Sequence, residues 1–271
     1  MIKRYLFSAD WRKEDVEFLK SLKINRKIDV GFFGFNVDQE THNVIMENYS
    51  NNTPLTKPKS FNVQFTGVTF SKKELDNASF YNLIGTGFPV GNGLPKNYKK
   101  QIFSYDNEDY KVNRTQIGLF RIKKPKWTNK RKNFTLHSEW DKMFFKKDFY
   151  QEVLAPLGLN YLDVINHSTG EVLSDTIQLE IPLAQSNLKI NNTLYDLYST
   201  ETPCGKKQYS QQHLDFFPNF ENLFEFHICY SREEFLGGYK RIIISKDFCK
   251  ILLDNNVIEY DSNHLIPFDN S

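Results

Sequence analysis

Cysteine is scarce in this sequence. The 271 residues include three cysteines, Cys204, Cys229 and Cys249. A small, odd number in a chain of this length argues against the disulfide framework that stabilises small secreted domains. Because free thiols are typical of a reducing compartment, the cysteine count predicts a cytoplasmic protein.

Long apolar runs are also missing. The sequence has no stretch of about 18 apolar residues, which excludes a transmembrane helix. The first ten residues contain Lys3 and Arg4 but no extended apolar segment followed by a cleavage site. We therefore expect neither a secretory signal nor a membrane partner.

Complete enzyme motifs are absent as well. The sequence contains no G-x-S-x-G, no H-E-x-x-H and no kinase motif set. The glycine-rich segment 85–93 lacks the spacing of a phosphate-binding loop, and Pro89 in it has no backbone N–H, so we expect a plain loop. The sequence predicts a non-catalytic protein without a cofactor, and an enzyme with dispersed active-site residues is the alternative.

The composition that is present is that of a globular protein. Basic and acidic residues nearly balance, 35 against 33, so the net charge of +2 does not indicate a particular partner. Aromatic residues make up 15% of the chain, including 24 phenylalanines. Because each buried aromatic side chain removes about 150–250 Å² from water, a substantial core is expected.

Hydrophobic patterning predicts short strands and helices in an irregular order. Strands are expected over residues 2–7, 28–35, 61–70, 101–110, 115–122, 140–145, 176–181 and 239–244, and helices over 10–19, 71–83, 148–157 and 246–253. This order favours an α+β fold with mixed or antiparallel sheets and peripheral helices. If there are two domains, we expect them at 1–120 and 121–271, and one compact unit is the alternative.

Two segments about 99 residues apart are alike. Met143–Phe149 and Ile242–Phe248 each contain three apolar residues, a polar pair and Asp-Phe. The pattern predicts a strand that leads into a helix capped by Asp148 or Asp247. Two related strand–helix halves are therefore expected, with chance similarity as the alternative.

A basic segment is the best candidate for a binding surface. Residues 121–132 include seven basic residues and enclose Trp127. Such a segment can bind phosphates and stack a base, can attract an acidic protein, or can be a solvated loop. The near-neutral charge argues against nucleic acid. The predicted partner-binding residues are Lys123, Lys124, Lys126, Trp127, Lys130, Arg131, Phe88, Phe216 and Phe217.

The sequence offers only a sparse set of metal-ligand types. Cys204, His213, His227 and Cys229 are the candidates, but only the last two are close in sequence. Structural zinc sites usually contain closely spaced pairs such as C-x2-C. We therefore predict core or surface roles for these four side chains and no metal.

The C-terminal part of the chain resembles a known family. Residues 202–209, TPCGKKQY, look like the end of a C-x-x-C-G-x-x-x-Y motif, and FFP at 216–218, SREEFLGG at 231–238 and LIPF at 265–268 follow in order. This order is similar to that of the double-CxxCG family of bacterial proteins, which are linked to immunity against polymorphic toxins. The resemblance covers roughly residues 115–268. Glu201 stands where the family has the first cysteine of this motif.

The resemblance implies a binding protein. An immunity protein remains in the cytoplasm of the producing bacterium, where it binds and neutralises a cognate toxin that is encoded nearby. It needs a stable scaffold and a complementary surface rather than a catalytic centre. An enzyme or a nucleic-acid-binding module is the alternative function.

Overall fold

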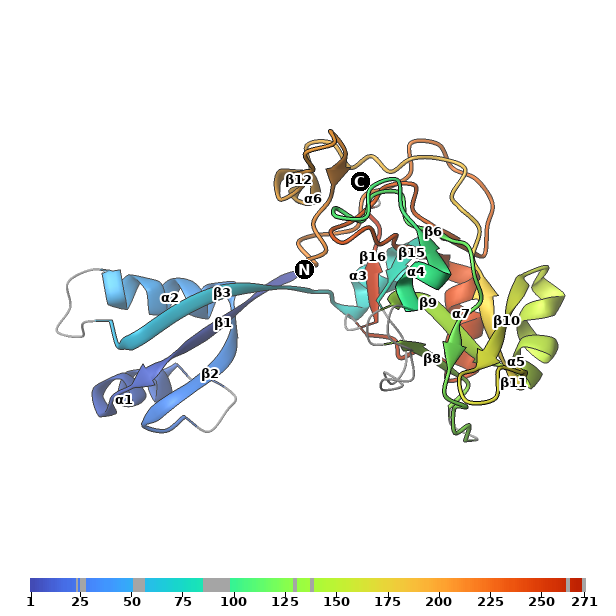
Figure 1. Ribbon diagram of the computed structural model, residues 1–271. Helices are drawn as coiled ribbons and strands as arrows, with labels where there is room; N and C mark the ends of the chain where they lie inside the picture. Colours follow the sequence, from blue (N-terminus) through green and yellow to red (C-terminus); the bar gives the residue numbers. More distant parts are fainter. Residues whose placement is uncertain are drawn as a thin grey trace. The chain divides into compact units, whose positions relative to one another are not determined.

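The computed structural model describes residues 1–22, 24, 28–50, 57–84, 98–128, 131–136, 139–261 and 264–269 (Figure 1). The chain forms two compact units. Unit 1 contains Met1–Ser71 with Gln212–Asp215, and unit 2 contains Lys72–Gln211 with Phe216–Ser271. This division lies after Ser71 and not near residue 121, because the strand at Arg121–Ile122 pairs with another strand inside unit 2.

Unit 1 consists of a three-stranded antiparallel sheet and two helices. Its elements are β1 (Ile2–Trp11), α1 (Lys13–Ser21), β2 (Gly31–Asp38), α2 (Gln39–Ser50) and β3 (Lys59–Thr69). The strand order is β2-β1-β3, so the first strand of the chain lies at the centre. The strands that the sequence predicts here are confirmed, with β2 displaced by three residues toward the C-terminus.

The two faces of this sheet differ in polarity, because side chains alternate between the faces along each strand. Phe7, Ala9 and Trp11 alternate along β1 and are buried with Phe35 of β2. The helices pack on this face through further apolar side chains, which include Val16, Leu19, Ile45 and Tyr49. The opposite face carries exposed polar side chains such as Asn36 and Asn62. Because successive side chains of a strand point to opposite faces, this alternation fixes which face carries the helices.

Helix α1 begins later than the sequence indicates. β1 continues through Trp11, so Asp10 belongs to the strand and does not cap the helix. The carboxylate that binds the helix N-terminus is that of Asp15, whose Oδ2 accepts a hydrogen bond from the backbone N–H of Arg12 at 3.0 Å. A carboxylate in the first turn also suits the positive end of the helix dipole.

Segment Gln212–Asp215 packs against β3 within unit 1. Gly67 of β3 has φ +136°, a conformation that side-chain-bearing residues rarely adopt. A Cβ atom at this position would lie 3.2 Å from the backbone oxygen of His213. Glycine therefore allows the close approach of the two backbones.

Unit 2 contains the remaining elements. In chain order they are α3 (Lys72–Asn77), β4 (Phe80–Leu83), α4 (Tyr98–Ile102), β5 (Phe103–Ser104), β6 (Thr115–Gln116), β7 (Arg121–Ile122), β8 (Asn133–Leu136), β9 (Glu139–Lys146), α5 (Lys147–Phe149), the π-helix η1 (Tyr150–Leu154), the 3-10 helix η2 (Ala155–Leu157), β10 (Asn160–Asn166), β11 (Val172–Glu180), α6 (Leu194–Leu197), β12 (Thr200–Glu201), β13 (Lys207–Gln208), β14 (Ile228–Tyr230), β15 (Ile242–Ser245), α7 (Lys246–Asp254) and β16 (Leu265–Pro267).

Two larger sheets organise unit 2. One has the order β7-β10-β11-β9-β8 and is antiparallel except for the β7–β10 pair, and the other has the order β14-β15-β4-β16 and is entirely antiparallel. The pairs β5–β6 and β12–β13 form small additional ladders. Together with unit 1, this arrangement confirms the predicted α+β class with mostly antiparallel sheets. Among the described helices, none is both long and apolar enough to cross a lipid bilayer.

Strand β4 corrects the predicted helix over residues 71–83. The helix α3 ends at Asn77, and Phe80–Leu83 forms a strand between β15 and β16. Tyr81 and Leu83 are buried, and the ladder partners come from residues more than 150 positions later in the chain. Long-range pairing therefore overrides the local helical pattern.

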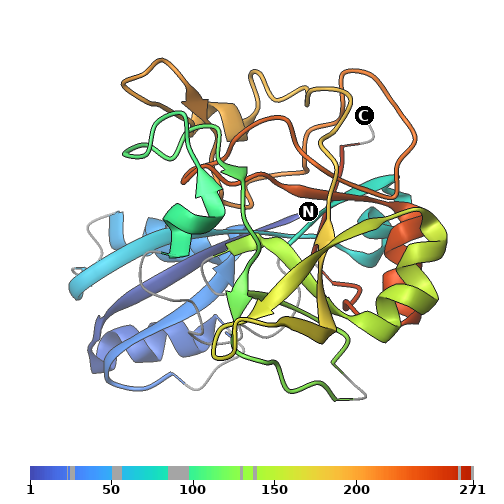
Figure 2. The same cartoon turned by 45° about the vertical axis from the view of Figure 1, so that its right-hand side comes forward.

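The two similar segments do form strand–helix pairs. β9 leads directly into α5 and η1, and β15 leads directly into α7. The helical segments that follow lie side by side in both views (Figures 1 and 2). The predicted aspartate caps are wrong, because the N-cap positions are Lys146 and Ser245. Only Ser245 caps with its side chain, accepting a hydrogen bond from Phe248 N at 3.2 Å.

Candidate functional site

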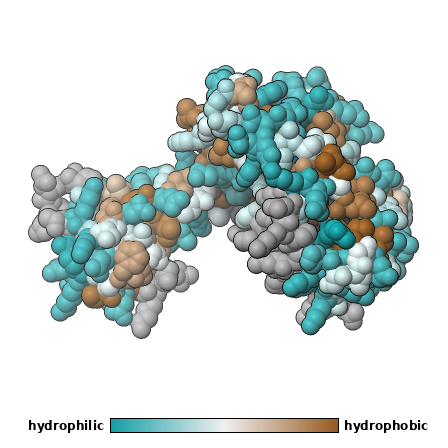
Figure 3. Space-filling view, in the orientation of Figure 1, coloured by the Kyte–Doolittle hydropathy of each residue, from teal (hydrophilic) through white to brown (hydrophobic). Residues whose placement is uncertain are grey.

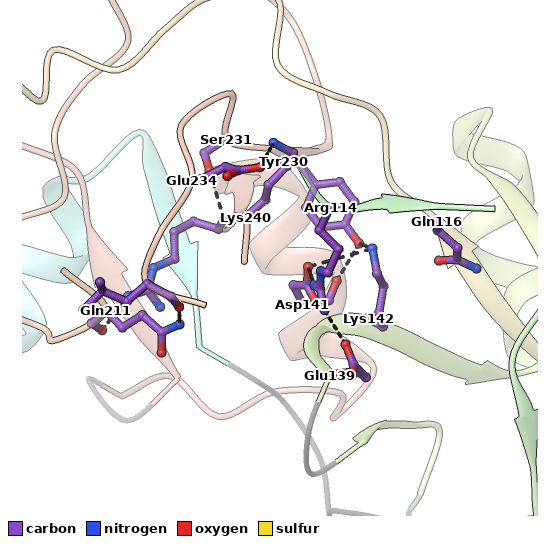
Figure 4. A network of polar contacts seen from close by, with 12 residues as sticks. Arg114, Gln116, Glu139, Asp141, Lys142, Gln211, Tyr230, Ser231, Glu234 and Lys240 are labelled. Atoms are coloured by element: carbon purple, nitrogen blue, oxygen red, sulfur yellow. Dashed lines mark hydrogen bonds and ion pairs between the residues drawn. The ribbon is translucent and has the colours of Figure 1, made fainter. Parts of the chain in front are cut away.

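The most concentrated polar chemistry of unit 2 is a buried cluster around Arg114 (Figure 4). Arg114 precedes β6, and its guanidinium forms ion pairs with Glu139 and Asp141. The two acidic residues lie two positions apart on β9, so they project to the same side of the strand. All three side chains are almost completely buried.

Aromatic rings complete the environment of the guanidinium. The Arg114 guanidinium carbon lies 4.5 Å from the ring centroid of Phe103 and 4.5 Å from that of Tyr239. Tyr98 donates a hydrogen bond from its hydroxyl to Glu139 Oε1 at 2.7 Å. Arginine is favoured at such a position because its planar cation can stack on rings and bind carboxylates at once.

Lys142 links the cluster to the second large sheet. Its Nζ donates a hydrogen bond to the Tyr230 hydroxyl at 3.1 Å and lies 3.8 Å from Asp141 Oδ2. The Tyr230 hydroxyl in turn donates to the backbone oxygen of Asp141. Because Lys142 belongs to β9 and Tyr230 to β14, these contacts join the five-stranded sheet to the four-stranded sheet.

The charges of the cluster balance. Arg114 and Lys142 supply two cations, and Glu139 and Asp141 supply two carboxylates. Burial lowers the pKa of Lys142, and the nearby carboxylate of Asp141 opposes this effect. Burial raises the pKa of Tyr239 to about 12 and raises that of Tyr230 as well. The tyrosines therefore remain protonated hydrogen-bond donors at neutral pH.

This arrangement acts as an internal connection between structural elements. It fixes the segment before β6, strand β9 and strand β14 through charge-assisted hydrogen bonds, which are the stronger kind. Asp141 Oδ1 has no hydrogen-bond partner among the described residues, so the cluster is not completely satisfied. A buried lysine of lowered pKa is a feature of some catalytic sites, but Lys142 here is engaged by both Tyr230 and Asp141.

A second polar group in Figure 4 binds the hairpin at 231–241 to the preceding segment. The Arg241 guanidinium donates to the backbone oxygen of Gln211 and lies 4.7 Å from the ring centroid of Phe235. Burial lowers the pKa of Arg241 to about 10. Lys240 Nζ lies 3.9 Å from Glu234 Oε1. In the SREEFLGG segment, Arg232 donates to the backbone oxygen of Ala184 and Glu233 accepts from the backbone N–H of Leu188, so these polar residues have structural roles.

The described residues of the predicted basic surface differ in exposure. Lys123, Lys124 and Lys126 are exposed. Trp127 is half-buried, because its Nε1 donates to Thr176 Oγ1 at 3.0 Å and its ring lies 5.4 Å from that of Phe134. The tryptophan therefore anchors the segment to unit 2 and does not project toward a partner.

The other predicted partner-binding residues differ in how far they are buried. Phe217 is 0% exposed and packs against Phe235 and Phe268, so its predicted contact with a partner is wrong. Phe216 and Arg131 are half-buried. Lys130, Phe88 and the glycine-rich segment 85–93 lie outside the described residues.

The four residues that the sequence offered as weak metal-ligand candidates do not form a cluster in the structure. Cys204 is exposed in the β12–β13 hairpin, Cys229 is buried on β14, and His213 and His227 are half-buried. In the described part of the chain, the ligand-type residues that come together in a group of three are Glu259, Asp261 and His264, with ligand atoms within 4.8 Å of one another. None of the predicted four belongs to this group.

The hairpin at Cys204 is stabilised by a hydroxyl group. Thr202 Oγ1 donates to the backbone oxygen of Lys206 at 2.8 Å and accepts from its backbone N–H at 3.1 Å. It also lies 3.1 Å from Cys204 Sγ. Glu201 is exposed on β12. The hairpin is therefore closed by Thr202.

The motifs considered in the sequence did not identify the residues of the Arg114 cluster. The segment EWDK at 139–142 places three charged residues at the start of a strand, directly before the apolar residues 143–145. Charged residues are almost never fully buried unless they are paired, so such residues in a core strand indicate an internal ion cluster. Arg114, far away in sequence, carries no comparable local pattern.

Comparison with known proteins adds no relative: no family model, no curated protein and no solved structure matches this chain significantly.

Proposed function

We propose that this chain is an immunity protein, which binds and neutralises a bacterial toxin without catalysing a reaction. The resemblance of residues 115–268 to double-CxxCG proteins motivates the proposal. The docking surface that we propose is the basic segment 121–127, and its partner is an acidic surface of the toxin.

The observation that carries the proposal is the way in which this segment is held. Pro125 is buried and Trp127 is half-buried against the sheet, whereas Lys123, Lys124 and Lys126 are exposed. Pro125 and Trp127 thus anchor the backbone of the segment, and the three neighbouring lysines remain exposed. Binding to a preorganised segment requires less ordering of side chains and backbone than binding to a flexible loop.

The positive charges of the exposed lysines are largely uncompensated within the protein. Among the described residues, ion pairs include Lys124 but neither Lys123 nor Lys126. Lys124 lies 3.6 Å from Asp175, but its side chain is 62% exposed, so the pair is weak and screened. Charges of one sign at such a surface accelerate encounter with an acidic partner and select against basic ones.

The Arg114 cluster supports a non-catalytic role. Its two cations and two carboxylates pair with one another, and its tyrosines bind the same groups. Hydrophilic side chains cover most of the visible surface in Figure 3, with smaller apolar patches between them. A scaffold with internally paired charges and a polar exterior suits a binding protein.

The experiment is co-expression of the chain with the protein encoded next to it. The wild-type chain should restore growth of cells that produce the toxic neighbour and should co-purify with it. The triple variant Lys123→Glu, Lys124→Glu, Lys126→Glu should weaken the complex at least tenfold, mainly through slower association. Its affinity should also depend less on salt concentration.

A matched control has the same change of charge elsewhere. Lys72, Lys73 and Lys250 are exposed lysines outside the segment, and their replacement by glutamate should leave affinity within about twofold, because distant surface charges are screened. Absence of both growth rescue and complex would refute the toxin-binding role. A complex that both triple variants weaken equally would refute the basic segment as its surface.

A further inference from the structure

Arg241 is a partly buried cation without a counter-ion. Other cations of unit 2 that are withdrawn from water have carboxylate partners: Arg114 pairs with two carboxylates, and Lys142 lies 3.8 Å from Asp141 Oδ2. The described residues include every aspartate and glutamate of the chain, and none of them forms an ion pair with Arg241. Because charged residues are rarely buried unless they are paired, this exception requires an explanation.

The Arg241 side chain is nevertheless held in place. Its guanidinium donates a hydrogen bond to the backbone oxygen of Gln211, and the guanidinium carbon lies 4.7 Å from the ring centroid of the buried Phe235. The Arg241 backbone is fixed as well, because its N–H donates to Ser231 Oγ at 2.9 Å and its oxygen accepts from Ser231 N at 2.8 Å. A side chain that is already ordered loses less conformational entropy when it binds a further group.

The hydrogen-bonding capacity of the guanidinium is only partly used. A guanidinium has five N–H donors, and here Nη2 donates to Gln211 whereas Nε is buried without a partner among the described residues. The whole residue is half-buried, so part of it reaches the surface. Burial lowers the pKa of Arg241 to about 10, and no carboxylate offsets this effect. Arg241 therefore combines a fixed position, incomplete hydrogen bonding and partial exposure.

A second unpartnered polar group lies on the same face of the four-stranded sheet. Arg241 directly precedes β15, and its side chain shares a face with Ile243 because side chains alternate along a strand. Asn82 of β4 pairs with Ile243, so it lies on this face as a diagonal neighbour of Arg241. Asn82 is 0% exposed, and neither its Nδ2 nor its Oδ1 has a hydrogen-bond partner among the described residues. Such groups are rare in folded proteins and mark this face as a candidate site for a polar ligand group.

We propose that Arg241 is an anchor for a carboxylate of the partner protein, supplied by an aspartate or glutamate side chain of the toxin. This inference rests on the proposed function and adds a contact that is separate in sequence from the basic segment 121–127. Partly buried arginines next to aromatic rings are frequent among the residues that contribute most to protein–protein binding.

The charge at this position favours a carboxylate over a phosphate. A carboxylate has one negative charge and two acceptor oxygens, which match a single guanidinium. A phosphate monoester carries a charge of about −1.5 to −2 at neutral pH and would need a further cation. The neighbouring Lys240 lies 3.9 Å from Glu234 Oε1, so its charge is already compensated.

The stability of the free protein separates a binding role from a structural one. An uncompensated cation that is withdrawn from water destabilises the fold, so Arg241→Met should leave the urea midpoint of unit 2 unchanged or raise it. An arginine with a purely structural role would behave in the opposite way, because methionine cannot donate to the backbone oxygen of Gln211. Circular dichroism of the full chain measures the midpoint.

The affinity for the protein encoded next to the chain should respond to the same substitution. Arg241→Met should weaken the complex at least tenfold, mainly through faster dissociation. Arg241→Lys keeps the charge but not the planar fork, so it should recover only part of the loss. Arg232→Met is the matched control on the same hairpin, because Arg232 is exposed, and it should weaken binding less than about threefold.

Acetate tests the site without the toxin. Titration of the full chain with sodium acetate should shift the NMR signal of the Arg241 Nε–H group in a saturable way, and sodium chloride at the same ionic strength should not. The signal is assigned by its loss in Arg241→Met. Inorganic phosphate should bind no more tightly than acetate.

The outcomes separate this inference from the proposed function. A complex that Arg241→Met weakens no more than Arg232→Met would overturn the anchor, while the proposed function stands. A lower urea midpoint for Arg241→Met, no saturable effect of acetate, or tighter binding of phosphate than of acetate would also overturn it. If no complex forms, the proposed function and the toxin as the source of the carboxylate both fail, and the acetate titration still decides whether Arg241 binds a carboxylate.

Discussion

Units 1 and 2 bury their polar groups in different ways. In the described part of unit 1, Asp15 is the one fully buried polar side chain, and apolar residues from one sheet face and two helices fill the core. Unit 2 buries Arg114, Glu139, Asp141 and Lys142 together. Its two large sheets are joined by these charges and by Tyr230.

This difference predicts which substitutions most reduce the stability of each unit. An apolar core loses stability gradually, by about 1–5 kcal/mol for each truncated side chain. A buried ion cluster contributes little net free energy when complete, but removal of one member leaves another charge buried without a partner. Unit 2 should therefore be far more sensitive to a single change of charge than unit 1.

The largest effect is expected for Arg114→Met. Methionine can fill much of the space between Phe103 and Tyr239, but it leaves the carboxylates of Glu139 and Asp141 buried without their cation. The free energy of unfolding of unit 2 should fall by about 3–5 kcal/mol. Urea denaturation followed by hydrogen exchange of β9 amides measures this loss.

Two further variants show whether charge is the cause. Addition of Glu139→Gln and Asp141→Asn to Arg114→Met removes the orphaned carboxylates and should restore part of the loss. Lys100→Met breaks the exposed Lys100–Glu108 ion pair and should cost less than about 1 kcal/mol. If Arg114→Met costs no more than Lys100→Met, the contrast between the units is wrong.

The corresponding test of unit 1 is Asp15→Asn. The Asp15 carboxylate accepts hydrogen bonds from the Arg12 side chain and from the Tyr49 hydroxyl at 2.9 Å. Burial alone would raise the pKa of Asp15, but these hydrogen bonds outweigh burial and the pKa lies below its usual 3.8. Loss of hydrogen bonds to a charged group should cost about 2 kcal/mol at neutral pH.

The pH dependence of this loss has a definite sign. Because folding lowers the pKa, the unfolded chain binds the proton more readily, so the stabilisation is complete above the unfolded pKa of about 4. It is lost as the pH falls through the lower folded pKa. The stability difference between wild type and Asp15→Asn should therefore narrow in acid, and exchange of α1 amides measures it. A constant difference down to about pH 2 would contradict the explanation; Asp10→Asn, at an exposed site, is the control.

The same contrast explains what the sequence predicts well. Residues 61–70 alternate between apolar and polar side chains, and this period identifies β3 because one face of the unit 1 sheet is covered and the other is not. Lys124, Pro125, Lys126 and Trp127 also alternate, which in hindsight places the tryptophan against the sheet. Lys123, Lys124 and Lys126 of the predicted surface are exposed, whereas Trp127 is an anchor.

Sequence patterns fail where partners are distant along the chain. The helical pattern of residues 71–83 extends into β4, whose neighbours come from the last thirty residues or so of the chain. Arg114 has no local feature that identifies Glu139 and Asp141 as its partners. Pairing across such separations depends on which elements become neighbours in the fold, and a local period contains no information about that.

The smallest effect is expected within unit 2, where the two similar strand–helix pairs begin differently. Ser245 Oγ accepts a hydrogen bond from Phe248 N at the start of α7, whereas Lys146 has no side-chain cap at the start of α5. Ser245→Ala should therefore cost about 1 kcal/mol and speed hydrogen exchange in the first turn of α7. Lys146→Ala removes only an ion pair with Asp148 in which both side chains are at least one third exposed, and it should cost less. Equal losses in the two variants would mean that the cap does not distinguish the two helices, and that packing of Phe149 and Phe248 on the sheets alone fixes where they begin.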